Sequence, residues 1–178
     1  METTKVAIIG LGTVGSGVAQ VLLSHGDRIA CQAGRPLELA TIIVTDVEKP
    51  RSLQLPEGLL STDLESLIQD PSIPVVIQLI GGLEPARSIM LRLLESGKDV
   101  ITANKALLAE HGSELFERAR ELGRSIAFEA SVCGGIPIVT AIGQSLAANR
   151  IESLCGILNG TCNYIMTRMT EEGISYEE

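Results

Sequence analysis

Residues that could hold a phosphate group occur near the N-terminus. The stretch GLGTVG, residues 10–15, has G-x-G-x-x-G spacing and directly follows the apolar run KVAIIG. In this context the first glycine permits a tight turn and the second lets a pyrophosphate approach the backbone. The third allows a helix to pack closely on a strand. The pattern therefore predicts a dinucleotide-binding turn between a buried strand and a helix.

A carboxylate and two cations follow at the end of a second predicted strand. Asp46 ends the stretch LELATIIVTD, but it lies farther beyond Gly15 than the usual spacing of about 20 residues. If Asp46 binds the adenine ribose, NAD is favoured, whereas Lys49 and Arg51 could hold the 2′-phosphate of NADP. A solvated loop is the third possibility, and the sequence leaves all three open.

A lysine lies at the end of the fourth predicted strand. The stretch TANKALL places Asn104 and Lys105 where this strand meets the next helix. Ligands of open α/β sheets bind outside the carboxyl ends of the strands. A lysine beside a bound nicotinamide could hydrogen-bond a carbonyl oxygen and take part in acid–base chemistry. The alternative is an ordinary solvated surface lysine.

The elements that must position these residues alternate along the chain. Apolar runs predict strands, and stretches with helical spacing of apolar residues predict helices. The predicted strands are residues 5–10, 37–46, 73–82, 98–102 and 125–132. The predicted helices are residues 13–26, 62–70, 84–97, 104–112 and 113–123. This order is typical of an α/β fold with a Rossmann-like, doubly wound parallel sheet.

The pattern changes at the stretch CGGIPI, which suggests a domain boundary. We expect a dinucleotide-binding domain over residues 1–133 and the first elements of an α+β substrate domain over residues 134–178. In the second part, residues 137–150 look helical and residues 151–158 look like a strand. Residues 159–173 look like a turn that leads into a helix.

Composition excludes several classes of protein. The formal net charge of −8 argues against a nucleic-acid partner. No apolar run reaches the length of about 18 residues that a membrane helix needs, and the N-terminus METTK is polar. The four cysteines form no CxxC pair, so free thiols in a reducing compartment are expected. We expect a cytoplasmic protein.

Taken together, five stretches resemble homoserine dehydrogenase. They are GLGTVGSGV, VIQLIGG, TANKALL, EASVCGGIPI and GILNGTCNYIMTRM, in that order. The resemblance implies reversible interconversion of L-homoserine and L-aspartate 4-semialdehyde by hydride transfer with NAD or NADP, a step toward threonine and methionine. It implies a homodimer for the complete enzyme. Because the family's chain continues past GISYEE, we expect a truncated substrate domain with exposed apolar surface and weak or absent activity.

The resemblance also implies roles for particular residues. The pyrophosphate would be held by Gly10, Gly12, Thr13, Val14 and Gly15. Lys105 would lie between nicotinamide and substrate, with Gly81 and Thr102 along the cofactor. The substrate would contact the turn formed by Asn159, Gly160 and Thr161. A monovalent cation, usually Na⁺, would be bound by Glu129, Val132, Gly134 and Ile136 through a carboxylate and main-chain carbonyls.

Two other functions remain open from the residues. Cys133 could form a thioester, as in phosphorylating semialdehyde dehydrogenases, but this chemistry needs a base and the chain offers only His25 and His111. A non-catalytic dinucleotide-binding module that senses redox state is the other alternative. The substrate-like stretches TANK and NGTCNY argue against such a module.

Overall fold

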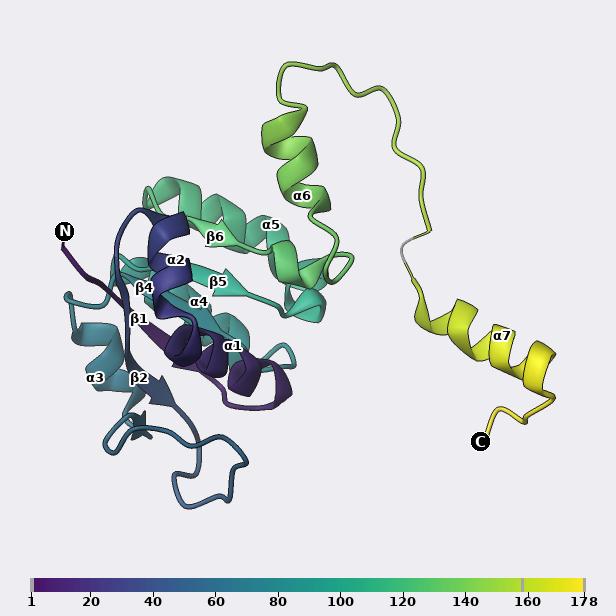
Figure 1. Cartoon of the computed structure of the whole chain (residues 1–178). Coiled ribbons are helices and arrows are strands. Elements are labelled where there is room, and N and C mark those ends of the chain that lie inside the picture. The colour runs from purple at the N-terminus through teal and green to yellow at the C-terminus, as the bar shows by residue number, and fades with distance from the viewer. Residues whose placement is uncertain (1, 158, 178) are drawn as a thin grey trace. The chain divides into compact units, whose positions relative to one another are not determined.

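The computed structural model of the chain describes residues 2–157 and 159–177. The chain divides into two compact units, Met1–Ser131 and Val132–Glu178. Figure 1 shows the sheet and most helices in the first unit, with α6 and α7 in the second.

The first unit is built on a parallel sheet of six strands in the order β3-β2-β1-β4-β5-β6. The strands are β1 (Thr4–Ile9), β2 (Leu37–Ile43), β3 (Leu60–Ser61), β4 (Val75–Gln78), β5 (Asp99–Thr102) and β6 (Ile126–Ala127). The strand order reverses between β1 and β4, the place where open sheets of this kind bind ligands. The predicted Rossmann-like fold is thus confirmed.

Helices cover the sheet on both faces (Figure 1). They are α1 (Thr13–Ser24), α2 (Gly26–Ala33), α3 (Leu64–Gln69), α4 (Ala86–Glu95) and α5 (Lys105–Glu121), followed by a 3₁₀ turn, Glu129–Ser131. In the central strand β1, Val6–Ile9 are apolar and buried because helices cover the sheet from both sides. Ala7 and Ile9 pack in one cluster, and Ile8 packs in the other.

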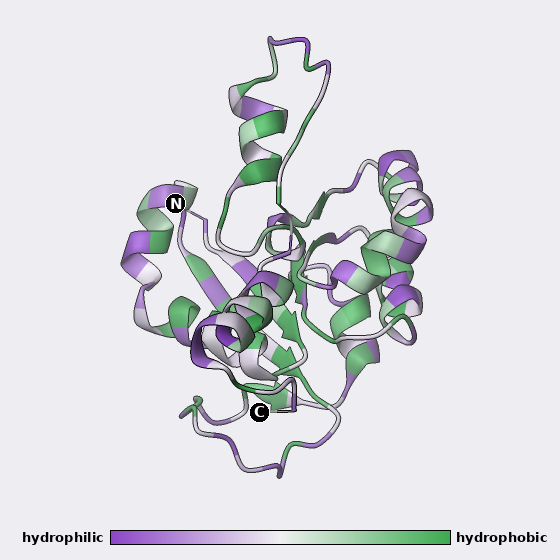
Figure 2. Ribbon diagram, turned by 90° about the vertical axis from the view of Figure 1, so that its right-hand side faces the viewer, coloured by the Kyte–Doolittle hydropathy of each residue, from purple (hydrophilic) through white to green (hydrophobic). Residues whose placement is uncertain are grey.

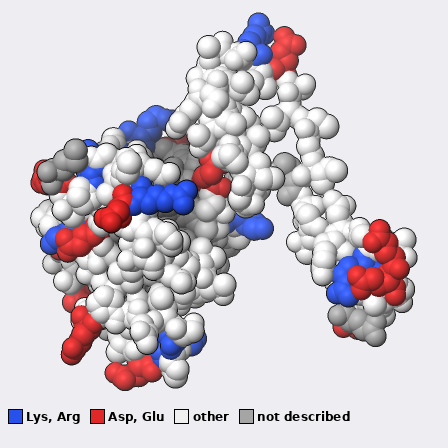
Figure 3. Space-filling view, viewed as in Figure 1, with Lys and Arg blue, Asp and Glu red and all other residues white. Residues whose placement is uncertain are grey.

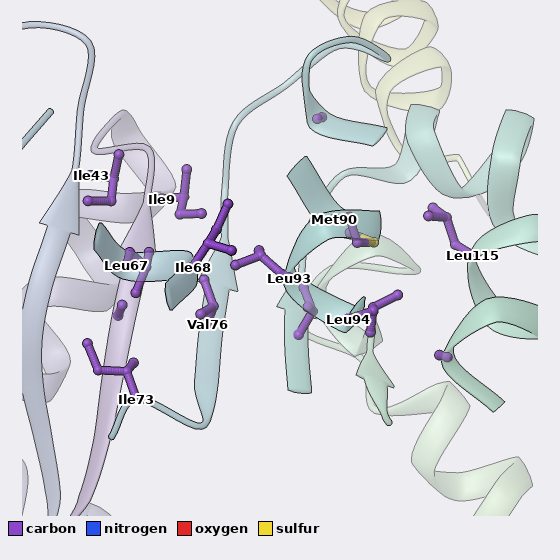
Figure 4. Packing of buried hydrophobic residues seen from close by; sticks show 14 of the residues in the cluster. Ile9, Ile43, Leu67, Ile68, Ile73, Val76, Met90, Leu93, Leu94 and Leu115 are labelled. Atoms are coloured by element: carbon purple, nitrogen blue, oxygen red, sulfur yellow. The ribbon is translucent and has the colours of Figure 1, made fainter. Parts of the chain in front are cut away.

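The larger cluster lies between the sheet and the helices α3, α4 and α5. Figure 4 shows Met90, Leu93 and Leu94 of α4 pointing toward side chains of the sheet and of α5. The smaller cluster packs α1 against β1, β2 and β4 through Ile8, Ala19 and Ile42. The hydropathy colours of Figure 2 show the same division, with hydrophobic strands inside and polar positions on the outer sides of the helices.

Several element predictions for the first unit were wrong in detail. The helix α2 and the short strand β3 were not predicted. The strand expected at 125–132 is only β6, because its second half turns into the 3₁₀ helix. Residues 104–112 and 113–123 form one helix, α5, rather than two.

The start of α3 also differs from the prediction. Thr62 and Glu65 have the spacing of a capping box in the sequence, but the N-cap in the structure is Asp63, whose carboxylate accepts a hydrogen bond from Ser66 N–H at 2.9 Å. Both assignments satisfy the same need for a side-chain acceptor at the free N–H groups of the first turn. Asp63 meets that need one residue later in the chain.

The described residues of the second unit form two helical segments. The helix α6 (Ile138–Thr140) continues into a π-helical turn, Ala141–Ser145, and α7 (Thr161–Glu172) ends at Gly173 in a left-handed conformation. The strand predicted over 151–158 is wrong for residues 151–157, and residue 158 lies outside the described residues. A strand needs a paired neighbour for its backbone groups, and no described residue pairs with this segment.

Apolar side chains of the second unit are exposed, as predicted for residues 134–178. The exposed large apolar residues include Ile136, Leu154, Ile157, Tyr164 and Met166. Figure 3 shows charged side chains on α7, whereas the segment 153–157 carries none. Over the whole described part of the chain, no helix combines the length and apolar character needed to span a bilayer.

Candidate cofactor site

Gly10 forms the turn that follows β1. Its φ of +94° is left-handed, a region that residues with a Cβ atom seldom adopt. A Cβ atom at this position would also lie 2.8 Å from Ile80 Cγ2. The N–H group of Gly10 donates to the carbonyl of Ile43 at 2.9 Å, which ties the turn to the end of β2. Gly10 is therefore required by both backbone conformation and packing.

Gly15 is buried in the first turn of α1 and faces the tight turn at Gly10. A Cβ atom on Gly15 would lie 2.1 Å from the carbonyl oxygen of Gly10, far inside any real contact. This position allows the helix to start directly against the end of the strand. The structure thus gives Gly15 the close helix–strand packing that the glycine pattern predicted.

Gly12 has a different environment. It is the N-cap residue of α1, and a Cβ atom there would meet no heavy atom within 4 Å. No side chain caps the N-terminus of α1. The first N–H groups of a helix lack intrahelical partners and carry partial positive charge, so they favour a bound anion. Packing does not explain a glycine here, whereas close approach of a ligand does.

A cavity of about 580 Å³ opens beside this turn, at the carboxyl ends of β1, β2 and β4. It is lined by predicted site residues from three separate segments, namely Gly10, Gly12, Asp46, Lys49, Arg51 and Gly81. The cavity lies at the point where the strand order reverses. The topology therefore brings together the phosphate turn, the carboxylate and the two cations.

The loop after β2 is held by its own side chains. Asp46 Oδ1 accepts a hydrogen bond from Glu48 N–H at 2.9 Å. The Arg51 guanidinium donates to the carbonyls of Asp46, Val47 and Lys49. In the described part of the chain, the Lys49 ammonium has no hydrogen-bond or ion-pair partner. Lys49 and Arg51 also line a second cavity of about 560 Å³ next to the first, together with Thr13.

Other predicted cofactor residues do not line the first cavity. Lys105 is exposed as the first residue of α5, and Val14 lies in the first turn of α1. Thr102 is fully buried, and its hydroxyl donates to Gln78 Oε1 at 3.0 Å. The fully buried Thr102 side chain therefore belongs to the protein interior.

A nearby carboxylate stays charged. Glu84 precedes Pro85, a residue that lines the cavity. The hydroxyl of Ser88 donates to Glu84 Oε2 at 2.7 Å, and this bond, together with a backbone bond from Ser88 and the charge of Arg87, lowers the pKa of Glu84. The Glu84 carboxylate therefore lies just before α4, where negative charge suits a helix N-terminus, and it pairs with Arg87 of the first turn at 3.4 Å.

The sequence predicted that Asn104 lies where the fourth strand meets the next helix, but it did not predict the contacts of this side chain. It is the N-cap of α5, and its side chain also reaches the loop after β4. An asparagine at the first position of a predicted helix is a recognised capping signal. The capping bond could thus have been predicted, whereas the bonds to a loop more than twenty residues away could not.

The predicted cation ligands fall in both units. Glu129 belongs to the 3₁₀ turn of the first unit, while Val132, Gly134 and Ile136 belong to the second. Carboxylate and carbonyl oxygens are the donors that a hard cation prefers. Among the described residues, no cluster of three or more His, Cys, Asp or Glu side chains could hold a metal ion.

The predicted substrate residues lie at the start of α7. Asn159 Oδ1 accepts a hydrogen bond from Cys162 N–H at 3.2 Å, Gly160 is the N-cap, and Thr161 is the first helical residue. All three are exposed. Cys133, the candidate nucleophile, has a left-handed φ of +51°. His25 lies at the junction of α1 and α2, and His111 lies 3.9 Å from Glu114 in α5.

The sheet order, the glycine turn and the cavity at the switch point define a Rossmann-like dinucleotide-binding protein. Residues 10–129 match the family model described as "Homoserine dehydrogenase, NAD binding domain", and residues 137–178 match the model described as "Homoserine dehydrogenase". The chain belongs to the homoserine dehydrogenase family.

Individual relatives agree with this assignment. Homoserine dehydrogenase of Synechocystis is 46% identical over 176 residues, which are 99% of this chain and 40% of that protein. The Bacillus subtilis enzyme is 44% identical, over 100% of this chain and 41% of its own length. A crystal structure of a homoserine dehydrogenase from Thiobacillus denitrificans has a TM-score of 0.89 at 42% identity, over 99% of this chain and 41% of that one. The chain thus spans about two fifths of the length of these relatives.

Proposed function

We propose that this chain is the cofactor-binding part of an enzyme that interconverts L-homoserine and L-aspartate 4-semialdehyde with NAD or NADP. Family membership supports this activity, and the glycine turn supports the cofactor. The single observation that carries the proposal is the environment of Gly12. Free space surrounds this glycine where a Cβ atom would lie, and it is the N-cap of a helix that no side chain caps, beside a large cavity. A bound pyrophosphate would occupy the space beside Gly12 and accept hydrogen bonds from the free N–H groups at the start of α1.

The roles of the protein groups follow from this placement. A bound NAD(P) supplies the hydride acceptor or donor at nicotinamide C4. Gly10, Gly12, Thr13, Val14 and Gly15 would hold the pyrophosphate, with Gly81 and the backbone of Thr102 farther along the cofactor. Lys105 would hydrogen-bond the substrate oxygen and move its proton. A homodimer of the complete enzyme remains a prediction.

The second unit would supply contacts to the substrate. The turn of Asn159, Gly160 and Thr161 offers an amide, backbone groups and a hydroxyl, which suit the polar groups of an amino acid. A monovalent cation, proposed as Na⁺, would be held by the Glu129 carboxylate and by the carbonyls of Val132, Gly134 and Ile136. The proposed ion would fix the end of the first unit without taking part in hydride transfer.

We further propose that the cavity prefers NADP. The Arg51 guanidinium already donates hydrogen bonds to three loop carbonyls, whereas the Lys49 ammonium has no protein partner among the described residues. A free ammonium beside the adenosine end of the cavity could pair with a 2′-phosphate. Asp46 has one carboxylate oxygen engaged by its own loop and would face the ribose.

Titration of the chain with NADPH and with NADH, followed by nicotinamide fluorescence, tests both proposals. We expect NADPH to bind about tenfold more tightly, as one charge-assisted hydrogen bond implies. Lys49→Ala should abolish this preference by weakening NADPH alone. Lys5→Ala is the matched control, because Lys5 does not line the cavity and lies at the opposite end of the sheet.

The outcomes separate the two proposals. Equal affinities for the two cofactors that Lys49→Ala leaves unchanged would contradict the preference for NADP while leaving the cofactor site intact. Absence of binding of either cofactor to a folded chain would contradict the site itself.

A further inference from the structure

Asn104 makes more hydrogen bonds than a helix cap requires. Its Oδ1 accepts from Leu107 N–H at 3.1 Å, and this bond alone caps α5. Its amide nitrogen donates to the carbonyl of Ile80 at 3.1 Å and to that of Gly82 at 2.7 Å. The residue is only 8% exposed. Because capping uses only the oxygen, the two donated bonds point to a second role.

The two carbonyls that Asn104 holds flank Gly81 in the loop after β4. Ile80 and Gly81 both line the 580 Å³ cavity. Gly82 has a φ of +80°, so the loop turns sharply directly beyond the cavity wall. A single nitrogen with two N–H groups can hold both carbonyls at once, which a carboxylate or a hydroxyl at the same position cannot do. Asn104 therefore fixes the path of the backbone that forms this wall.

A buried group of polar residues supports Asn104 from below. The N–H group of Asn104 donates to Thr102 Oγ1 at 3.1 Å, and this hydroxyl donates to Gln78 Oε1 at 3.0 Å. Ser131 Oγ donates to the carbonyl of Thr102 at 3.0 Å. Gln78 and Thr102 are fully buried, where polar groups are costly unless they are hydrogen-bonded. The Thr102 hydroxyl and Gln78 Oε1 bond to each other, whereas Gln78 Nε2 has no partner among the described residues. The bonds that are made restrain the backbone from which Asn104 projects.

Lys105 directly follows Asn104 and begins α5. One side chain therefore connects the cavity wall at Gly81 with the helix start at Lys105. We propose that Asn104 is a positioning residue, which keeps the nicotinamide end of the cofactor site in a fixed relation to Lys105. This inference rests on the proposed cofactor function and extends it to a residue that contacts neither cofactor nor substrate.

The test compares two ligands that differ only in the nicotinamide. NADH and ADP-ribose share the adenosine, the pyrophosphate and the second ribose. Asn104→Ser keeps a good capping oxygen but loses the NH2 group that holds both loop carbonyls at once, because its single O–H is on a shorter side chain and can donate to at most one acceptor. Asn104→Asp keeps the shape of the side chain and also loses the donors, so it serves as the second variant. Asp63→Ser exchanges the N-cap of α3 in the same way and is the matched control.

We expect Asn104→Ser to raise the dissociation constant of NADH about fivefold, a coupling typical of residues that link two sites. The dissociation constant of ADP-ribose should stay within about twofold, because the glycine turn and the Asp46 loop are untouched. Asp63→Ser should change neither value. Calorimetric titration gives both constants, and thermal unfolding reports any loss of stability.

Two results would contradict the positioning role and leave the cofactor site standing. One is an equal loss of affinity for both ligands together with a lower unfolding temperature. The other is unchanged affinity for both ligands in a folded variant. If the unaltered chain binds neither ligand, the proposed function fails, and the inference fails with it.

A double-mutant cycle tests the connection to Lys105. Lys105→Met should weaken NADH binding in the unaltered chain and have less effect in the Asn104→Ser background, because the lysine is already displaced. Strictly additive effects would show that Asn104 does not act through Lys105.

Discussion

The two units of this chain use similar local patterns and reach different degrees of packing. In Met1–Ser131, apolar faces of helices and strands meet in two buried clusters. In Val132–Glu178, no described residue is buried, although α7 carries apolar side chains at helical spacing. The difference shows that a pattern specifies an element, whereas burial requires a second element with a complementary face.

The sharpest test of this difference uses the same substitution in both units. Met90 in α4 is fully buried, and Met166 in α7 is 61% exposed. Met90→Ala should lower the free energy of unfolding by about 2–5 kcal/mol, because it leaves a cavity in the larger cluster. Met166→Ala should change it by less than about 0.5 kcal/mol. Urea unfolding followed by circular dichroism measures both, and similar losses would show that the second unit is packed as tightly as the first.

A second test concerns two glycines of α1. Gly15→Ala should cost about 3 kcal/mol, because the added methyl group would collide with the carbonyl of Gly10. Gly17→Ala is its control, since the position has no atom within 4 Å of an added Cβ. This control should stabilise the helix by about 0.5–1 kcal/mol. If Gly15→Ala unfolds like the unaltered protein, the tight contact between α1 and β1 is not needed.

These positions also show what the sequence could predict. The alternation of apolar runs and helical patterns was sufficient for the parallel sheet, because Val6–Ile9 of β1 and Val75–Ile77 of β4 form continuous apolar stretches in the interior of the sheet. The glycine pattern correctly gave a turn at Gly10 and close packing at Gly15. These features depend on local geometry that neighbouring residues determine.

Features that depend on distant contacts were missed. The strand predicted over 151–158 has the right composition, yet no described residue pairs with residues 151–157. The two-residue strand β3 exists only because β2 offers it an edge. The tie from Asn104 to the loop after β4 joins segments more than twenty residues apart. No local pattern encodes such a bond.

A third test concerns the buried lysine at the amino end of β5. Lys98 is 1% exposed, and its ammonium donates to the carbonyls of Asp70 and Ile73 at 2.6 Å and 2.9 Å. Lys98→Met should cost about 1–3 kcal/mol, because both carbonyls lose their donor. A comparable substitution at an exposed cation of the second unit, such as Arg150→Met, should have little effect.

The pH dependence of Lys98 gives a further readout. Burial lowers the pKa of Lys98 below the ordinary lysine value of 10.5. At pH values between the lowered pKa in the folded chain and the ordinary pKa in the unfolded chain, the unfolded chain binds more protons than the folded chain. The free energy of unfolding contributed by Lys98 therefore rises with pH over this range. The stability of the unaltered protein relative to Lys98→Met should therefore increase as the pH approaches 10.5 from below. A difference that falls over this range would contradict the effect of burial.

The smallest expected effect lies in the second unit. The Arg168 guanidinium pairs with Glu172 one turn later in α7, with the Nη2 and Oε2 atoms 2.5 Å apart. An exposed pair of this spacing stabilises a helix only slightly, because water and salt screen the two charges. Arg168→Ala should lower the helical signal of α7 slightly, and added salt should reduce the difference. A salt-independent loss would indicate that the Arg168 guanidinium contributes through its contact with the Tyr164 ring, whose centroid lies 5.9 Å from Arg168 Cζ.

The most direct test of the central claim is the affinity of Gly12→Ala for NADPH. Gly12 has an ordinary negative φ and free space around it, so alanine should fold there with an unfolding temperature within about 3 °C of the original. The methyl group would occupy the place of the proposed pyrophosphate and should weaken NADPH binding at least about tenfold. Gly26→Ala, at another glycine with open space, should bind NADPH normally. Normal binding by a folded Gly12→Ala variant would contradict the proposed site.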